Sequence, residues 1–167
     1  MSGDAEFSIP VDFLRARYKY DPATGAITVR GSKSRKRCGS VTKDGYRVMK
    51  VSYGGRRIQI AAHKVAWAIH HGVMPDHDVD HKDLNRRNNR IKNLRKATRS
   101  QNLVNRPNVG ALPKGVTKSR SKTKPFQAQV TINGVYRYLG CYTTPDEAHA
   151  AYLKHALPAW GEFLRVA

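Results

Sequence analysis

Cysteine is scarce in this sequence, since Cys38 and Cys141 are the only two among 167 residues. They form no C-x-x-C pair, which argues against a cysteine zinc site, and two isolated thiols fit a reducing cytosol better than a disulfide scaffold. Long apolar runs are also lacking. The first residues, MSGDAEFSIPVDF, have neither the basic start nor the apolar stretch of a signal peptide. We therefore expect a cytoplasmic protein that is not secreted and has no membrane-spanning segment.

Acidic residues are few, with 12 Asp and Glu against 31 Lys and Arg, so the formal net charge is +19. Such an excess predicts attraction to a polyanion, most simply nucleic acid, with salt-sensitive binding. A ribosome-like RNA-binding protein would show the same excess. A membrane-surface protein would also do so, but no long basic amphipathic helix is present. Hydrophobic residues make up 40% of the chain, which is enough for at least one packed core.

Four regions follow from the pattern of the chain. Residues 1–62 are predicted to be rich in strands, including a hairpin that turns at Gly54-Gly55 between two alternating runs. Residues 63–105 begin with a helix from about His63 that Gly72 ends, and they continue into a polar segment. Residues 106–113 contain prolines and glycines without periodicity and read as a linker. Residues 114–167 are predicted to form a small sheet covered by one helix.

The polar segment, DVDHKDLNRRNNRIKNLRKATRSQN, combines groups that phosphodiester hydrolysis requires. A neutral imidazole can take a proton from water near pH 7, and His81 supplies one. A hard divalent cation can absorb the charge on the departing oxygen, and Asp80 and Asn102 offer oxygen ligands. The imidazole also needs its second nitrogen held, and Asn93 is a candidate for this role. We expect a strand at VDH and a strand or turn at IKNLRKA. Thr98 and Gln101 match a capping box, which places Asn102 in the first turn of a helix.

The ordered D-H, N in IKNL and N in RSQN, preceded by HKVAWAIHHG, resemble the HNH endonucleases, specifically the homing type common in phages. This resemblance, over about residues 18–105, implies a ββα-metal (His-Me finger) nuclease module that binds one Mg²⁺ or Mn²⁺ per active site. It implies that Asp80 and Asn102 are metal ligands, that His81 is the general base and that Asn93 orients it. A phage-encoded chain would work in the host cytoplasm. We expect His63 to be structural. Turn formation is predicted for three further asparagines of the segment, namely Asn85, Asn88 and Asn89.

The last region shows strong local signals. Asn133-Gly134 predicts a tight hairpin, and Thr144, Pro145 and Glu147 predict a capped helix start. The pattern through FQAQVTINGVYRYLGCYTTPDEAHAAY resembles the plant ethylene-response-factor (Apetala) type DNA-binding domain, in which a three-stranded antiparallel sheet lies in the major groove. By alternation, one face should pack on the helix and the other should meet DNA. The residues expected on the DNA face are Gln127, Gln129, Thr131, Tyr136 and Tyr138.

The sequence as a whole predicts an α+β protein with two modules that acts as a metal-dependent DNA endonuclease on double-stranded DNA. Nicking and double-strand cutting are both open, as are monomer and homodimer, and no protein partner is evident. The alternatives are a non-catalytic DNA-binding regulator with a degenerate nuclease fold, or an RNA-binding structural protein. Basic side chains expected to contact DNA are Arg35, Arg37, Arg86, Arg87 and Arg120.

Overall fold

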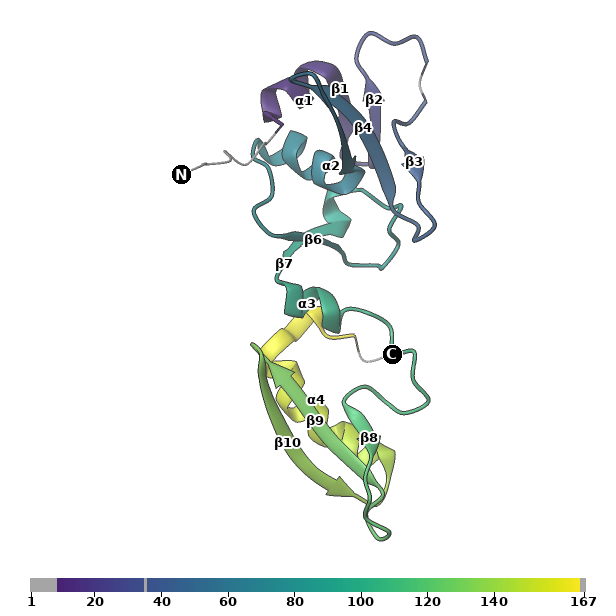
Figure 1. The fold of residues 1–167 in the computed structure, drawn as a ribbon, viewed down its shortest axis with the longest axis vertical. Coiled ribbons are helices and arrows are strands. Elements are labelled where there is room, and N and C mark those ends of the chain that lie inside the picture. The colour runs from purple at the N-terminus through teal and green to yellow at the C-terminus, as the bar shows by residue number, and fades with distance from the viewer. Residues whose placement is uncertain (1–8, 35, 166–167) are drawn as a thin grey trace. The chain divides into compact units, whose positions relative to one another are not determined.

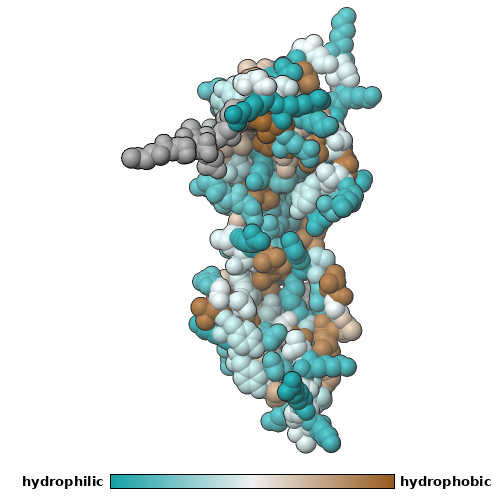
Figure 2. Space-filling model, in the orientation of Figure 1, coloured by the Kyte–Doolittle hydropathy of each residue, from teal (hydrophilic) through white to brown (hydrophobic). Residues whose placement is uncertain are grey.

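A computed structural model describes residues 9–34 and 36–165. The chain divides into two compact units, the first ending at Ala97 and the second beginning at Thr98. Figure 1 shows the helices and strands of both units. Helices and strands occur in each unit, so the expected mixture of α and β structure is confirmed. In Figure 2, hydrophilic side chains occupy much of the visible surface of each unit, with apolar side chains in scattered groups.

The first unit begins with helix α1 (Val11–Arg17), which leads directly into a hairpin of β1 (Tyr18–Asp21) and β2 (Ala26–Val29). The hairpin turns directly after β1, where the carboxylate of Asp21 accepts hydrogen bonds from the backbone of Ala23 and Thr24. Gly25 then takes a left-handed backbone with φ of 71°. The residues of this turn therefore suit the antiparallel pairing of β1 with β2.

A three-stranded antiparallel sheet follows, in the order β3 (Ser40–Val41), β4 (Arg47–Tyr53) and β5 (Arg56–Ala61). The predicted Gly54-Gly55 turn joins β4 to β5. Helix α2 (Ala62–His71) comes next and ends at Gly72, whose left-handed backbone stops it as predicted. The core of this unit lies between α1, α2 and the strands, and its largest fully buried side chains are Leu14, Met49, Val51 and Val65.

The polar segment forms a second, two-stranded antiparallel pair in the first unit. Strand β6 (Asp78–His81) pairs with β7 (Leu94–Ala97), and Asp80 lies opposite Arg95 while His81 lies opposite Leu94. Residues 82–93 form the loop between them, which we call the site loop. It ends in a short 3₁₀ helix, η1 (Ile91–Asn93), where the sequence pattern allowed a strand or a turn. Val79 and Leu94 anchor this pair to the core.

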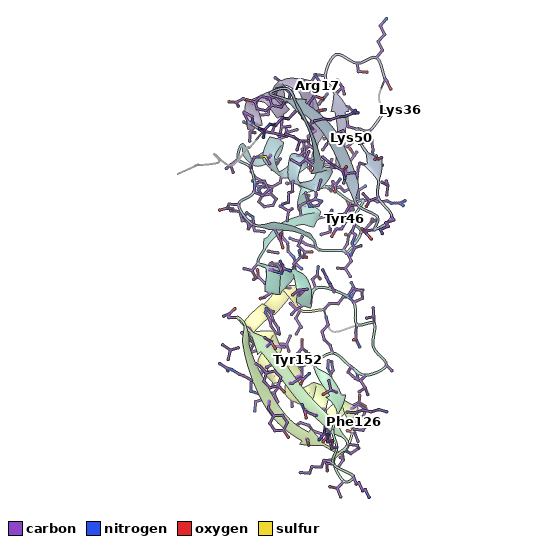
Figure 3. The ribbon with its side chains drawn as sticks, in the orientation of Figure 1. Arg17, Lys36, Tyr46, Lys50, Phe126 and Tyr152 are labelled. Atoms are coloured by element: carbon purple, nitrogen blue, oxygen red, sulfur yellow. The ribbon has the colours of Figure 1, made fainter. Side chains whose placement is uncertain are left out.

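The second unit begins with helix α3 (Arg99–Val104) and continues with a sheet in the order β10 (Val135–Tyr142), β9 (Phe126–Ile132) and β8 (Val116–Lys118). Helix α4 (Pro145–Trp160) and the short 3₁₀ helix η2 (Gly161–Phe163) follow the sheet. Ala128 and Val130 of β9 are buried in the same clusters as Ala148 and Tyr152 of α4, so one face of the sheet packs on the helix. Figure 3 labels Phe126 on β9 and Tyr152 on α4.

Both predicted capping boxes are present. The hydroxyl of Thr98 accepts from the backbone N–H of Gln101, whose side chain accepts in return from Thr98 N–H. Thr144 and Glu147 make the same reciprocal pair at the start of α4. The first box also marks where the second unit begins, so α3 falls in that unit, whereas the sequence pattern groups it with residues 63–105. Among residues 9–34 and 36–165, no helix is long and apolar enough to cross a lipid bilayer.

Close packing of the β1–β2 hairpin against the site loop gives a stability prediction. A Cβ added to Gly25 would lie 2.6 Å from both Arg90 N and Asn89 C, whereas one added to Gly31, which has nearly the same φ (72° against 71°), would meet no described atom within 4 Å. Both Gly→Ala changes carry the left-handed penalty of about 1–2 kcal/mol. Gly25→Ala should lose roughly 1–3 kcal/mol more, from crowding of the backbone.

Urea unfolding of the two variants and of the unchanged protein measures this difference. Because Gly31→Ala carries the same backbone penalty without the crowding, it is the matched control. Equal free energies of unfolding for the two variants would show that the hairpin does not press on the site loop.

Candidate functional site

Strand β6 carries the two residues on which the predicted chemistry rests. Asp80 and His81 are neighbours in sequence, and neighbouring side chains on a strand point to opposite faces. Both are buried, with exposed fractions of 6% and 3%. A carboxylate and an imidazole that are withdrawn from water need polar partners, because a buried polar group without one destabilises the fold.

The partner of Asp80 within the first unit is Arg95, directly across from it on β7. Its Nε and one terminal nitrogen each lie 3.0 Å from Oδ2 of Asp80, and Arg95 is 8% exposed. The sequence pattern assigned no role to Arg95, which lies in the stretch IKNLRKA that was predicted to be a strand or turn. The strand register is the signal that could have found it, since a hairpin centred on the site loop places residue 95 opposite residue 80.

The partner of His81 is Asn89, whose Oδ1 lies 3.0 Å from Nε2 of the imidazole. Burial lowers the pKa of His81 below its usual value, although the hydrogen bond to Asn89 and the nearby carboxylates of Asp80 and Asp83 act in the opposite direction. A lowered pKa keeps the imidazole neutral near pH 7, which is the state that can accept a proton. The ring is therefore buried in a polar surrounding and in the right protonation state for a base.

Asn93 does not make the hydrogen bond that the sequence assigned to it. Its side-chain amide donates to Oδ1 of Asp83 and to the carbonyl of Asn88, and its own Oδ1 accepts from the backbone of Asp83. Its backbone carbonyl accepts from the N–H of Lys82, the residue after His81. Asn93 thus closes the site loop on itself, and the side chain that bonds to the imidazole is that of Asn89. A role of Asn93 in orienting His81 stays a prediction.

The predicted turn formers of the site loop behave differently from one another. The side chains of Asn85 and Asn88 accept from the backbone two residues on, as turn-forming asparagines do. Asn89 is only 2% exposed and serves His81 instead. The left-handed backbone expected of asparagine is found at Leu84, with φ of 60°. The distribution of roles among these asparagines was not visible in the sequence.

His63 lies on α2 beside the candidate base. The centroid of the His63 ring is 5.0 Å from that of His81, in an edge-to-face arrangement. The ring centroid of Tyr46, which Figure 3 labels, is 5.5 Å from that of His63. Burial, followed by the charges that His81 and Lys64 would carry, lowers the pKa of His63 to about 3. Its Nδ1 is buried and has no hydrogen-bond partner within the described part of the chain. His63 packs between helix and hairpin, and it does so as a neutral ring.

The chemistry of a hard cation such as Mg²⁺ requires few protein ligands, since one or two carboxylates and the substrate phosphate are sufficient. Within residues 9–34 and 36–165, no three His, Cys, Asp or Glu side chains gather as a metal-binding group. The buried carboxylate of Asp80 suits the requirement for an oxygen ligand beside the base. Asn102 lies in the first turn of α3, as expected, and belongs to the second unit. A shared ion between Asp80 and Asn102 involves both units and stays a prediction.

The basic side chains predicted to contact DNA are exposed wherever the structure describes them. Arg86 lies with its guanidinium carbon 4.8 Å from the centre of the Tyr46 ring, and it donates to the carbonyl of Asp44 at 2.7 Å. Arg37, Arg87 and Arg120 are exposed, and Arg35 lies outside the described residues. Of the arginines predicted to contact DNA, Arg86 is therefore the one placed next to the candidate site by these contacts.

The outer face of the second unit's sheet carries the polar residues that alternation predicts. Tyr136 and Tyr138 are each 56% exposed, and Tyr136 donates its hydroxyl to Oε1 of Gln129 at 3.1 Å. Gln127 and Gln129 of β9 are half-buried, and Thr131 is exposed. This face holds two aromatic rings and two carboxamides side by side, which are groups that can meet bases.

Part of the chain matches a known family of nucleases. Residues 61–104 match the family model described as HNH endonuclease, and this range contains α2, β6, the site loop and β7. An uncharacterized HNH endonuclease of Acanthamoeba polyphaga mimivirus is 32% identical over 121 residues, which are 72% of this chain. The chain spans 62% of the length of that relative.

A solved structure of the HNH homing endonuclease I-HmuI, described in terms of DNA binding and cleavage, is 25% identical to the chain. The match covers 92% of this chain and 82% of the I-HmuI chain, with a TM-score of 0.47.

The low pKa of His63 predicts how stability depends on pH. The unfolded chain binds a proton at His63 below about pH 6.5, while the folded chain does so only near pH 3. Stability should therefore fall as pH decreases through this window, by up to about 1.4 kcal/mol per pH unit from this group. His63→Phe, which keeps an aromatic ring beside His81, Tyr46 and Lys64, should remove that part of the slope.

Urea unfolding at several pH values between 6.5 and 4.5 measures the slope. The control is His70→Phe on the exposed side of the same helix, which should leave the slope as it is in the unchanged protein. A His63→Phe slope equal to that of the unchanged protein would mean that His63 is protonated in the folded state.

Proposed function

We propose that the chain is a metal-dependent endonuclease that hydrolyses phosphodiester bonds of double-stranded DNA, with His81 as general base. The observation that carries the proposal is the buried, neutral imidazole of His81, next in sequence to a buried carboxylate. The match of residues 61–104 to the HNH endonuclease model supports it. So does the net charge of +19, which favours association with DNA.

In the proposed reaction His81 takes a proton from the attacking water. The neutral form of the imidazole is the one that can accept this proton near pH 7. Asp80, with Asn102 as the predicted second ligand, would hold one Mg²⁺ or Mn²⁺. When bound, that ion stabilises the negative charge of the leaving oxygen. Arg95 holds the carboxylate of Asp80 in place through a hydrogen bond from Nε and an ion pair with a terminal nitrogen.

The second unit is proposed to recognise DNA through the outer face of its sheet. Gln129 and Gln127 can bond adenine through their carboxamides, and Thr131 can meet the thymine methyl. Tyr136 and Tyr138 add aromatic surface to the same face. Arg37, Arg86, Arg87 and Arg120, and Arg35 by its position in a basic run, would contact phosphates and set the position of the duplex.

One observation favours the alternative, a DNA-binding regulator that does not cut. Arg95 occupies Oδ2 of Asp80 with two nitrogen atoms, so its positive charge lies where a cation would bind. In this case the chain would bind DNA tightly and show no cleavage with any divalent ion. The cleavage experiment below separates the two functions.

His81→Ala should reduce the rate of plasmid cleavage by about 100- to 10,000-fold, since that is the usual contribution of a general base. Conversion of supercoiled plasmid to nicked or linear forms in Mg²⁺ measures the rate, and chelation of the metal should abolish it. His70→Ala on the exposed end of α2 is the control and should cut normally. Equal rates for His81→Ala and the unchanged protein would contradict the proposal, and DNA binding without cutting by the unchanged protein would favour the regulator.

Gln129→Ala should change which DNA sites are cut more than it changes the total cutting rate on random DNA. The loss of one bidentate contact to a base is worth about 1–3 kcal/mol of discrimination, while the nuclease unit is untouched. Sequencing of cleavage ends from a randomised DNA library measures the preference. His155→Ala, on the exposed side of α4, is the control. An unchanged site preference for Gln129→Ala would show that this face does not read the sequence.

A further inference from the structure

Asn89 contacts one of the two ring nitrogens of His81. Its Oδ1 lies 3.0 Å from Nε2, and the side chain is 2% exposed. A carboxamide oxygen can only accept a hydrogen bond, so Nε2 must carry the hydrogen. A neutral imidazole has one hydrogen on its two nitrogens, and Nδ1 then holds the lone pair. The contact with Asn89 thus selects one tautomer.

Asn89 is itself held from a part of the chain far away in sequence. The hydroxyl of Tyr20, on β1, donates to the backbone carbonyl of Asn89 at 2.7 Å. The backbone N–H of Ile91 donates to the carbonyl of Pro22 in the turn after β1, at 3.2 Å. The position of Gly25 leaves room for the backbone of Asn89 at distances that no side chain would allow. The β1–β2 hairpin therefore contacts the site loop at Asn89 and at the two residues that follow it.

The remaining polar contacts of the site loop stay within the loop. Asp83 accepts from the side chains of Asn88 and Asn93 and from the backbone of Asn85. These bonds give the loop its shape but do not reach the imidazole. Asn89 contacts the ring directly, and its side chain is not one of those bonded to Asp83, so its replacement should affect the base without dismantling the loop.

We infer that Asn89 is a positioning residue that makes Nδ1 of His81 the reactive nitrogen, and that the β1–β2 hairpin holds Asn89 for this purpose through Tyr20. The inference rests on the proposed function where it concerns cleavage, but the tautomer can be observed without any cleavage. Residues that orient a catalytic group from behind typically contribute about 10- to 100-fold to activity. Because the DNA itself does not contact Asn89 in this scheme, the effect should fall on kcat and leave KM nearly unchanged.

The test compares two replacements of Asn89. Asn89→Leu has a similar size and no acceptor, and Asn89 is not among the described residues with a left-handed backbone, so leucine is sterically tolerable there. Asn89→Asp keeps an oxygen acceptor at the same place. We expect kcat of plasmid cleavage to fall about 10- to 100-fold in Asn89→Leu and to be largely restored in Asn89→Asp. Tyr20→Phe should lower kcat about three- to tenfold, as the loss of one hydrogen bond would.

A spectroscopic readout accompanies the kinetics. Long-range ¹H–¹⁵N spectra at one pH near 7.5 report which ring nitrogen of His81 carries the hydrogen. We expect the Nε2–H form in the unchanged protein and in Asn89→Asp, and a mixture of tautomers in Asn89→Leu. The control is Asn85→Ala in the same loop, whose side chain bonds, among residues 9–34 and 36–165, to the backbone of Arg87. It should change neither kcat nor the spectrum.

The outcomes separate the inference from the proposed function. Full kcat and an unchanged tautomer in Asn89→Leu would overturn the positioning role, even if His81→Ala is inactive. If the unchanged protein cuts no DNA, the proposed function fails, and the tautomer alone then decides the inference. A mixed tautomer in Asn89→Leu would uphold it, and an Nε2–H form in that variant would refute it.

Discussion

The hydrogen bond between Nε2 of His81 and Oδ1 of Asn89 joins the strand that carries the candidate base to the loop that follows it. Both side chains are buried, so the bond forms away from competing water and its geometry is well defined. Two further sets of contacts in the first unit hold this loop in place. The site loop bonds to itself through Asp83 and Asn93, and the β1–β2 hairpin holds the loop from outside.

The electrostatics of the site explain why a strongly basic chain can carry a neutral base. Burial lowers the pKa of both His81 and His63, and the positive side chains nearby, Arg86 for His81 and Lys64 for His63, act in the same direction. The excess charge that attracts DNA therefore also discourages protonation of these rings. The carboxylate of Asp80 opposes this effect at His81, while the guanidinium of Arg95 compensates for the carboxylate charge.

Sequence patterns predicted those features of the fold that depend on local chemistry. The capping boxes at Thr98 and Thr144, the stop at Gly72 and the hairpin at Asn133-Gly134 are all present, because each arises from bonds within a few residues. The buried side of β9 followed from simple alternation.

The features that escaped prediction depend on how distant parts of the chain meet. Several asparagines of the site loop have the same chemistry, and only the folded loop determines that residue 89 reaches His81 while residue 93 turns to Asp83. The pairing of Arg95 with Asp80 needs the register of β6 and β7. The support from Tyr20 joins residues 69 positions apart, a separation at which a single sequence carries no signal.

Neutron diffraction from a deuterated crystal of the unchanged protein tests the central claim most directly, because it locates the hydrogen isotope on each nitrogen of His81. We predict a deuteron on Nε2, directed at Oδ1 of Asn89, and none on Nδ1. A deuteron on Nδ1, whether alone or together with one on Nε2, would contradict the account, since the ring would then have no lone pair where the base requires it.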